Sequence, residues 1–235
     1  MSSKVDLKLD WCSHKAAKFA CEHWHYSGCI PKSKLVKVGV WENRTFIGVV
    51  IFSYGATSGL VNPYGLKMTE GCELTRIALN SHSSSVTRVV SIALSMLKKE
   101  NPKLRLVVSF ADTKEGHVGG IYQGGNWVYT GTTIPADHYK YNGKLWHGRA
   151  FRSSFGSHKN YIGKGIEIIK GSVKYRYLYP LDDAMRKQIE PLRKSYPKKE
   201  DSSVRSVTSA RQATSLQEAV QLRPGRTILQ ESACG

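Results

Sequence analysis

The sequence predicts an α/β protein, in which strands and helices alternate along the chain. Residues 104–110 form a short apolar run rich in β-branched side chains, which indicates a buried strand, and 116–123 beyond it indicate a short helix. Two segments, 36–42 and 45–53, alternate between apolar and other residues around a short turn, as in a β-hairpin. Apolar residues recur at helical spacing over 86–99. Together these observations indicate the α/β class.

The N-terminal part of the chain is predicted to contain a helix before the hairpin and a loop and a strand after it. The helix covers 13–26, with Ser13 as its N-cap, and a glycine and a proline follow it. The segment 54–71 holds four glycines and is predicted to be a long loop, of the kind that usually serves a functional site. Residues 72–79 alternate again and are predicted to be a strand.

The middle of the chain carries the helix over 86–99 and the strand and short helix that follow it. Either Ser84 or Ser85 can cap the first of these helices, which ends before a proline. The strand at 104–110 then leads to the helix at 116–123, which two glycines stop.

The C-terminal part is predicted to be basic and to end in a tail. A strand covers 127–133, a basic hairpin is formed by 166–169 with 173–178, and a basic helix covers 183–194. Residues 200–235 are rich in Ser, Thr and Gln with weak periodicity, which predicts a largely disordered tail.

Length and composition exclude several classes of protein. A chain of 235 residues can bury one sizeable core, with or without an appendage. No apolar stretch approaches the roughly 18 residues of a membrane span, and the polar N-terminus is unlike a signal peptide. The five cysteines are odd in number and irregularly spaced, which favours reduced thiols in a cytosolic compartment over a disulfide framework.

The chain is strongly basic, with a formal net charge of +17. Residues 140–199 hold 15 Lys and Arg against 4 Asp and Glu, and Tyr, Trp and Phe residues are interspersed among them. Charge concentrated in this way suits a phosphate backbone with stacked or flipped bases. A membrane surface, or solubility alone, is the alternative.

The order of the predicted elements resembles the GNAT acyltransferase fold, and 121–127 resemble the segment where GNAT enzymes place a Tyr before a Gly-aromatic pair. The resemblance implies a central mixed sheet flanked by helices, with a basic C-terminal extension. It divides the chain into a catalytic core over 1–135, an extension for DNA contact over 136–199 and the tail. The chain departs from the family at 80–88, which lacks the glycines that bind the acyl-CoA pyrophosphate.

Three motifs together resemble the Mom family of phage DNA-modification proteins: His25-Tyr26-Ser27-Gly28 with Pro31, the segment 72–79, and 110–127. This resemblance implies an enzyme that converts adenine in double-stranded phage DNA to a carbamoylmethyl derivative on its exocyclic amine. It further implies protection of phage DNA from host restriction and a location in the host cytoplasm.

Four residues are candidates for catalysis. Asp112, at a strand end, could bind the adenine amine or act as a base, or it could simply cap the next helix. His117, expected inside that helix, could be a neutral base or a solvent-facing residue. Tyr122 matches the position where GNAT enzymes keep a proton donor for the leaving group, with a core tyrosine as the alternative. His25 is expected near the site.

The donor is expected to bind at the loop and helix start that follow the 72–79 strand. The candidate donor-binding residues are Ser83, Ser84, Ser85, Arg76 and Arg88. The implied product carries a methylene on the amine and a terminal amide, which favours a glycyl donor such as glycyl-tRNA, with an acyl-CoA as the runner-up.

No metal site is firmly predicted. Cys21 and His25 lie at i and i+4, which can bind zinc or iron, but a second pair is missing and a buried cysteine is the better interpretation. If a metal is bound, His25, His117 and Asp112 form the expected set, which would suit iron.

The basic segment supplies the candidate DNA-binding residues, which are Lys164, Lys174, Arg176, Arg149 and Arg152. Double-stranded DNA is the expected partner, with tRNA as a further candidate. A DNA-binding module that masks restriction sites by occupancy, and a conventional acetyl-CoA-dependent N-acetyltransferase, are the alternative functions.

Overall fold

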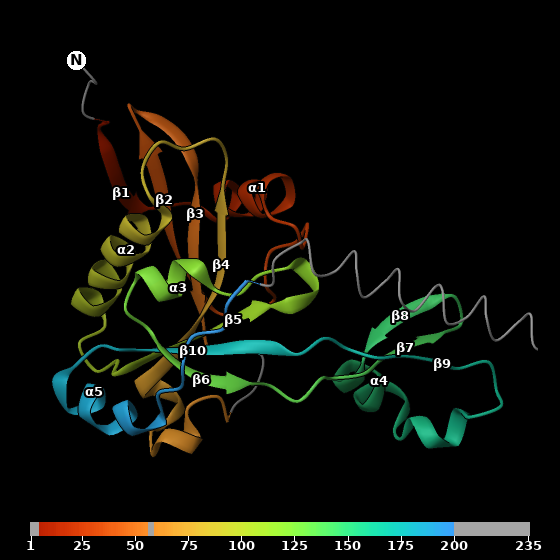
Figure 1. The fold of residues 1–235 in the computed structure, drawn as a ribbon. Coiled ribbons are helices and arrows are strands. Elements are labelled where there is room, and N and C mark those ends of the chain that lie inside the picture. Colours follow the sequence, from red (N-terminus) through yellow and green to blue (C-terminus); the bar gives the residue numbers. More distant parts are fainter. Residues whose placement is uncertain (1–4, 56–58, 200–235) are drawn as a thin grey trace, which may run out of the picture. The chain divides into compact units, whose positions relative to one another are not determined.

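The computed structural model describes residues 5–55 and 59–199, except the side chains of residues 147 and 149, and Figure 1 shows their arrangement. The described elements belong to one unit, which ends at Tyr196. Its main sheet has seven strands in the order β1-β2-β3-β4-β5-β10-β6, and a small sheet has the order β8-β7-β9. The predicted tail at 200–235 lies outside the described residues.

The strands and helices have the following bounds. The strands of the main sheet are β1 (Leu7–Trp11), β2 (Leu35–Glu42), β3 (Thr45–Ser53), β4 (Gly71–Leu79), β5 (Leu106–Asp112), β6 (Val128–Thr132) and β10 (Lys174–Pro180). Those of the small sheet are β7 (His138–Tyr141), β8 (Lys144–His147) and β9 (Glu167–Ile169). The helices are α1 (His14–Trp24), α2 (Val86–Glu100), α3 (Gly120–Gly124), α4 (Gly148–Phe155) and α5 (Asp183–Ile189). The fold is thus α/β with a central mixed sheet flanked by helices, as the sequence predicts.

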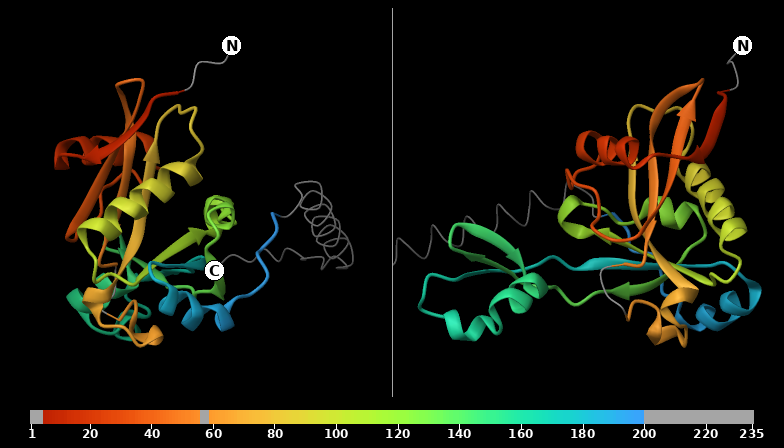
Figure 2. Two further views of the ribbon diagram at one scale, coloured as in Figure 1. Left: turned by 90° about the vertical axis from the view of Figure 1, so that its left-hand side faces the viewer. Right: turned by 180° about the vertical axis from the view of Figure 1, so that it is seen from behind.

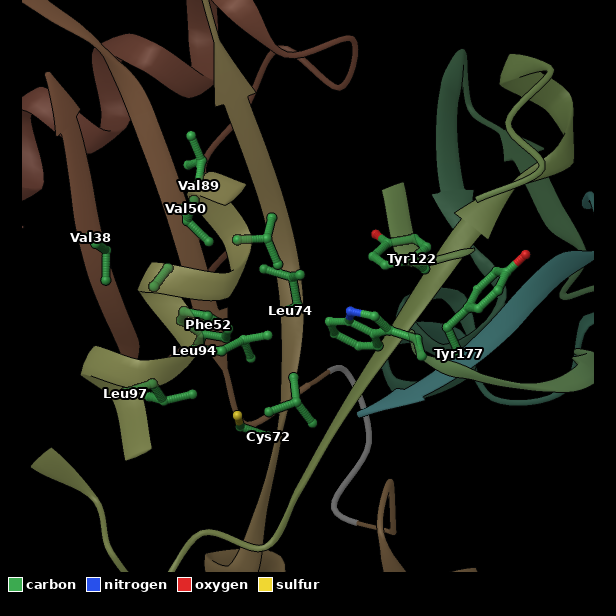
Figure 3. Close-up of a cluster of buried hydrophobic side chains, with 14 of the residues drawn as sticks. Val38, Val50, Phe52, Cys72, Leu74, Val89, Leu94, Leu97, Tyr122 and Tyr177 are labelled. Carbon is green, nitrogen blue, oxygen red and sulfur yellow. The ribbon is translucent and has the colours of Figure 1, made fainter. Parts of the chain in front are cut away.

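Helices cover both faces of the main sheet. Leu94 and Leu97 of α2 pack with Phe52 of β3 and Leu74 of β4 in the largest buried cluster (Figure 3). The other face is covered by α1, whose Ala17, Ala20 and Cys21 pack on β3 and β4, and by α5, which packs on β5, β6 and β10. Figure 2 shows α1 and α2 on opposite sides of β2 and β3.

Local sequence signals set the helix starts. The Ser13 hydroxyl accepts the backbone N–H of Ala16 at 3.2 Å, and the Ser85 hydroxyl accepts that of Arg88 at 3.3 Å. Each cap satisfies an N–H group that has no partner within the helix. The predicted caps of α1 and α2 are therefore confirmed, with Ser85 rather than Ser84 in this role for α2.

β4 and β5 are the parallel pair of the main sheet, and they pair over only three residues each. The ladder joins Gly71–Glu73 to Leu106–Val108 and then stops, although both strands continue. All other pairs in this sheet are antiparallel. The two strands separate beyond Glu73, and this opening positions the candidate site.

The predicted hairpin of 166–169 with 173–178 is wrong. β9 pairs with β7 in the small sheet, whereas β10 lies in the main sheet between β5 and β6. The glycine between these strands, Gly171, allows close passage rather than a tight turn, because a Cβ there would lie 2.0 Å from the carbonyl oxygen of Ala136. β10 thus lies in the main sheet although it falls within the predicted extension over 136–199, and the boundary at 135 stays a prediction.

Three smaller differences concern element bounds. The first strand, β1, pairs with β2 at the sheet edge and was not predicted. The predicted helix over 116–123 begins only at Gly120, after a short 3-10 helix at Thr113–Glu115. The predicted helix over 183–194 is α5 followed by a 3-10 helix at Glu190–Leu192, where Pro191 has no N–H to continue the α-helix.

The small sheet has a core of aromatic side chains. Tyr139 and Tyr141 of β7 contact Phe151 of α4, with ring centroids 5.0 and 5.9 Å away. Phe155 and Tyr161 complete this cluster. Most of the aromatic residues that the sequence placed among basic residues here thus stabilise the small sheet. Within residues 5–55 and 59–199, no helix is long and apolar enough to cross a membrane.

Candidate functional site

A pocket of about 170 Å³ lies where β4 and β5 separate. It is lined by residues from α1 and the segment after it, from β4, and from the turn and helix after β5. These residues are Trp24, His25, Tyr26, Leu74, Thr75, Arg76, Ile77, His117, Ile121 and Tyr122. The structure thus brings together three of the four candidate catalytic residues, His25, His117 and Tyr122. Arg76, a candidate donor-binding residue, lines the same pocket.

Tyr122 is held in the pocket by its ring and by its hydroxyl. The ring packs against those of Trp127 and Tyr177, each with a centroid distance of 5.0 Å. Ser109 Oγ lies 2.8 Å from Tyr122 Oη and 2.8 Å from the carbonyl oxygen of Leu74. The Ser109 hydroxyl has one proton, and a carbonyl can only accept, so that Tyr122 donates its proton to Ser109 when both contacts form. Burial raises the pKa of Tyr122 to about 12, which keeps the phenol protonated at neutral pH.

His25 follows the last turn of α1 and is neutral. Burial first, and then the charges of Arg76 and His117, lower the pKa of His25 to about 4. The Ser27 N–H donates to Nδ1 of His25 at 3.1 Å, and the Ser27 hydroxyl lies 2.8 Å from the same atom. Because Nδ1 accepts, the neutral ring carries its proton on Nε2. His25 can therefore donate a hydrogen bond to a ligand at neutral pH.

Arg76 enters the pocket because β4 contains a bulge. The pairing with β3 passes from Leu74–Phe52 to Arg76–Ile51, which leaves Thr75 as the extra residue. The bulge reverses the alternation, so that Glu73 and Arg76 lie on one face of β4, whereas the regular strand predicted over 72–79 would place them on opposite faces. Arg76 Nη1 donates to the Thr75 carbonyl at 2.8 Å, while its buried Nε has no hydrogen-bond partner among the described residues.

His117 lies in the loop before α3, which begins only at Gly120, and not inside a helix as the sequence predicts. Tyr177 holds this loop in place. Its hydroxyl donates to the Val118 carbonyl at 2.5 Å. A Cβ on Gly119 would lie only 2.4 Å from the Tyr177 ring, so only glycine fits there. Gly119 has a φ of +81°, which also favours glycine. Gly119 thus allows a tyrosine of β10 to approach the backbone closely.

Asp112 does not share the pocket of Tyr122. Along β5, Val108 and Phe110 face the cluster under α5, while Ala111 faces the cluster that contains Tyr122. Asp112 follows the alternation to the α5 side and lines a neighbouring groove, so these two candidate catalytic residues do not line one pocket.

The Asp112 carboxylate is fully engaged with protein groups. It accepts hydrogen bonds from the Ser172 hydroxyl at 2.8 Å and from the Lys114 N–H at 3.0 Å, and it pairs with Lys174 at 3.2 Å. Burial opposes ionisation most strongly, but these contacts together outweigh it and lower the pKa of Asp112. A carboxylate held in this way is a helix cap and an ion-pair partner, which was the alternative interpretation.

The predicted donor loop is occupied by a carboxylate of the chain itself. Glu42, at the end of β2, accepts the Ser83 N–H at 2.9 Å and the Ser84 N–H at 2.7 Å. Ser85 caps α2, and Arg88 is exposed on its first turn. The Ser83 and Ser84 N–H groups, and the Arg88 N–H group that Ser85 caps, are therefore already satisfied, which argues against Ser83, Ser84 and Ser85 as donor ligands.

The structure separates the candidate DNA-binding residues. Lys164 and Arg152 are exposed near the small sheet, and Arg149 lies in α4 with its side chain outside the described part. Lys174 pairs with Asp112, and Arg176 Nε donates to the Thr130 hydroxyl at 3.2 Å. Lys164 and Arg152 are therefore free to contact a DNA backbone, whereas Lys174 and Arg176 have partners within the main sheet.

The conditional metal set is not assembled. His25 and His117 line one pocket, but Asp112 lines a neighbouring one. Over residues 5–55 and 59–199, no three His, Cys, Asp or Glu side chains are grouped so that they could hold a metal ion. Cys21 is buried against β3 and β4.

Two residues of the site were missed from the sequence. Ser109 is the polar residue within an apolar strand, and that pattern is a signal for a buried hydrogen bond. Glu42 ends an apolar strand that becomes buried, but its partners lie more than 40 residues away in the sequence. Only the pairing of β2 within the sheet brings it to α2.

The sequence of this chain matches a known protein family. Residues 6–198 match the model of the Mom protein family. The chain is 24% identical over 192 residues to methylcarbamoylase mom of Escherichia phage Mu, an alignment that covers 78% of this chain and 79% of that protein. Among solved structures, one from Acinetobacter baylyi ADP1, named for an expected acetyltransferase activity, aligns with a TM-score of 0.43 and 12% identity. That alignment covers 84% of this chain and all of the other.

Proposed function

Because the chain belongs to the Mom protein family, we propose that it is a phage enzyme that modifies adenine in DNA at the exocyclic amine and leaves a carbamoylmethyl group there. The modification would protect the DNA from restriction. The relative from phage Mu is named a methylcarbamoylase, which supports this group. The observation that carries the proposal is the pocket between β4 and β5, where Arg76 Nε is buried with no hydrogen-bond partner in the described part of the chain and a neutral His25 lines the same pocket.

The pocket offers donors for a developing oxyanion. A buried donor without a partner is costly, and a ligand that accepts its hydrogen bond removes that cost. Arg76 supplies a cation and His25 an Nε2–H group, and both residues line the pocket, so a carbonyl oxygen bound between them would gain stabilisation as it becomes negative. Tyr122 keeps its proton at neutral pH and can turn this proton from Ser109 to a leaving oxygen bound in the pocket, and His117 can accept the proton of the attacking amine.

The proposed donor is an activated ester of glycine, such as glycyl-tRNA. Glu42 occupies the start of α2 and places a negative charge where the pyrophosphate of an acyl-CoA would need N–H groups. A second anion beside this carboxylate would be repelled. An acyl-CoA is therefore the less favoured donor.

The proposed reaction has two steps, and neither requires an oxidant or a reductant. The adenine amine attacks the ester carbonyl, its C–N bond forms, the ester C–O bond breaks, and a proton passes from the amine to the leaving oxygen. The free glycyl amine then attacks the purine ring carbon and loses a proton. The bond from that carbon to the original exocyclic nitrogen breaks, and this nitrogen gains a proton and becomes the terminal amide.

The test is to incubate the purified chain with duplex DNA and one labelled donor at a time: glycyl-tRNA, glycyl-CoA or acetyl-CoA. The DNA is then digested and its nucleosides are identified by mass spectrometry. We expect label from glycyl-tRNA in a carbamoylmethyl adenine nucleoside. Arg76→Gln should lower its yield at least ~100-fold, as for the loss of an oxyanion donor. Arg44→Gln, at the exposed β2–β3 turn, is the matched control and should retain full yield.

Two outcomes would contradict the proposal. DNA binding without any new adenine nucleoside would favour a module that masks sites by occupancy. N-acetyladenine formed from acetyl-CoA would favour a conventional acetyltransferase.

A further inference from the structure

Ile134 is the most exposed large apolar side chain among the described residues, with 92% of its surface accessible. It lies between β6 and β7, in the connection from the main sheet to the small sheet. A single exposed apolar side chain is common on protein surfaces, so the exposure of Ile134 gains meaning only from what surrounds it. A partner that covers Ile134 would remove apolar surface from water, which is favourable.

The backbone beside Ile134 is fixed on both sides. Before it, the Thr133 N–H donates to the Lys174 carbonyl at 2.8 Å, and the Lys174 N–H donates back to the Thr133 hydroxyl at 3.1 Å. After it, the backbone of Ala136 packs directly on Gly171, where any Cβ would clash at 2.0 Å. The exposed side chain therefore extends from a braced segment and not from a free loop.

Ile134 borders a groove of about 550 Å³ that adjoins the pocket between β4 and β5. One wall comes from the main sheet with Phe110 and Asp112, and the other from the small sheet with Leu145 and Ile169. Tyr26 lines both the groove and the pocket, and its exposed ring contacts the rings of His25 and His117. A base that enters the groove meets this ring before it reaches Arg76.

We propose that Ile134 is a wedge that enters the base stack of duplex DNA and fills the space left by an extruded adenine, while Tyr26 stacks on the extruded base. The inference rests on the proposed function, because it supplies the step by which a paired adenine reaches the pocket. A reaction on a base in duplex DNA requires that base to leave the stack. Proteins that separate base steps commonly insert an apolar side chain such as Ile, Leu or Phe. The braced position of Ile134 beside the groove meets both requirements.

The experiment compares duplex and single-stranded forms of one circular DNA as substrates. Ile134→Ser should lower modification of the duplex about tenfold or more, because the gap in the stack is no longer filled. Modification of the single strand should stay within about twofold of the wild-type value, since no stack must be opened. Ile134→Leu should restore activity on the duplex. Ile162→Ser, which changes another exposed isoleucine (64% accessible) far along the chain, is the matched control.

A second measurement does not depend on catalysis. The chain is bound to duplex DNA without a donor and treated briefly with permanganate, which oxidises thymines that have lost their pairing and stacking. We expect reactive thymines opposite the extruded adenines with the wild-type chain and with Ile134→Leu, and none with Ile134→Ser. Equal losses on duplex and single strand, full duplex activity of Ile134→Ser, or no reactive thymine with the wild type would each overturn the wedge. Failure of the proposed function would appear separately, as wild-type chain that modifies neither form.

Discussion

The hydroxyl groups of Ser109 and Tyr122 lie 2.8 Å apart at the point where β4 and β5 separate. The same Ser109 hydroxyl lies 2.8 Å from the carbonyl oxygen of Leu74, just beyond the last residue of β4 that pairs with β5. It thus satisfies a carbonyl that the opening of the sheet leaves without a partner in β5, and it fixes the orientation of the Tyr122 phenol. Ser109 therefore stabilises the fold at this opening and also positions the proposed acid, Tyr122.

Tyr122→Phe should lower the yield of modified adenine at least ~100-fold, as expected for a positioned acid. The melting temperature should change little, because Ser109 still donates to Leu74 and the ring still packs. Ser109→Ala is the contrasting variant. It leaves the Leu74 carbonyl unsatisfied and should destabilise the fold by about 1–3 kcal/mol. Nucleoside analysis and thermal unfolding test both variants, and full yield from Tyr122→Phe would remove the phenol from the reaction.

Glu42→Gln should destabilise the chain at neutral pH and make its stability less sensitive to acid. The amide can accept only one of the two N–H groups well, which costs about 1–3 kcal/mol. Burial opposes ionisation of Glu42 most, yet the hydrogen bonds from Ser83 and Ser84 outweigh it and lower its pKa.

The sign of the Glu42 effect follows from the lowered pKa. Below the ordinary value of 4.5 the unfolded chain takes up a proton that the folded chain does not, so stability is lost as the pH falls through the folded pKa. The difference in the free energy of unfolding between wild type and Glu42→Gln should therefore become smaller below pH 4.5 in denaturant unfolding experiments. A constant gap between pH 7 and pH 3 would contradict this role of Glu42.

His25 should remain neutral well below its ordinary pKa of 6.5. Burial, Arg76 and His117 lower its pKa to about 4, so the unfolded chain binds the proton first and the fold loses stability as the pH falls from 6.5 to 4. An NMR titration of the imidazole nitrogens, assigned with His25→Gln, measures the midpoint directly. Arg76→Gln should move that midpoint upward. A midpoint near 6.5 in the wild type, or a proton on Nδ1, would contradict the assigned tautomer.

Asp112→Asn should affect stability more than activity. The amide keeps the helix cap but loses the charge that pairs with Lys174, so we expect a loss of about 1 kcal/mol, since half-exposed ion pairs contribute little. Modification should remain within a fewfold of the wild-type value at a temperature where both are folded. A loss of modification of about 100-fold with an unchanged melting temperature would show that Asp112 takes part in the reaction.

The sequence by itself determined the elements whose signals are local. Ser13 and Ser85 cap their helices because a hydroxyl reaches an N–H group three residues away. The hairpin of β2 and β3 follows from alternation around a short turn, and α2 from its apolar spacing. The α/β class and the neighbourhood of His25, His117 and Tyr122 were predicted on this basis together with the family resemblance.

Only the tertiary structure decided the contacts between segments far apart in the chain. Lys174 meets Asp112 because β10 inserts between β5 and β6, which no local pattern encodes. Arg76 reaches the pocket through a single bulge that reverses the alternation of β4, and Glu42 reaches α2 through the pairing of its strand. Where no bulge interrupts an element, local periodicity fixes which side of that element a residue faces. The contacts of that side depend on strand order and register, which the whole chain sets through the burial of its core.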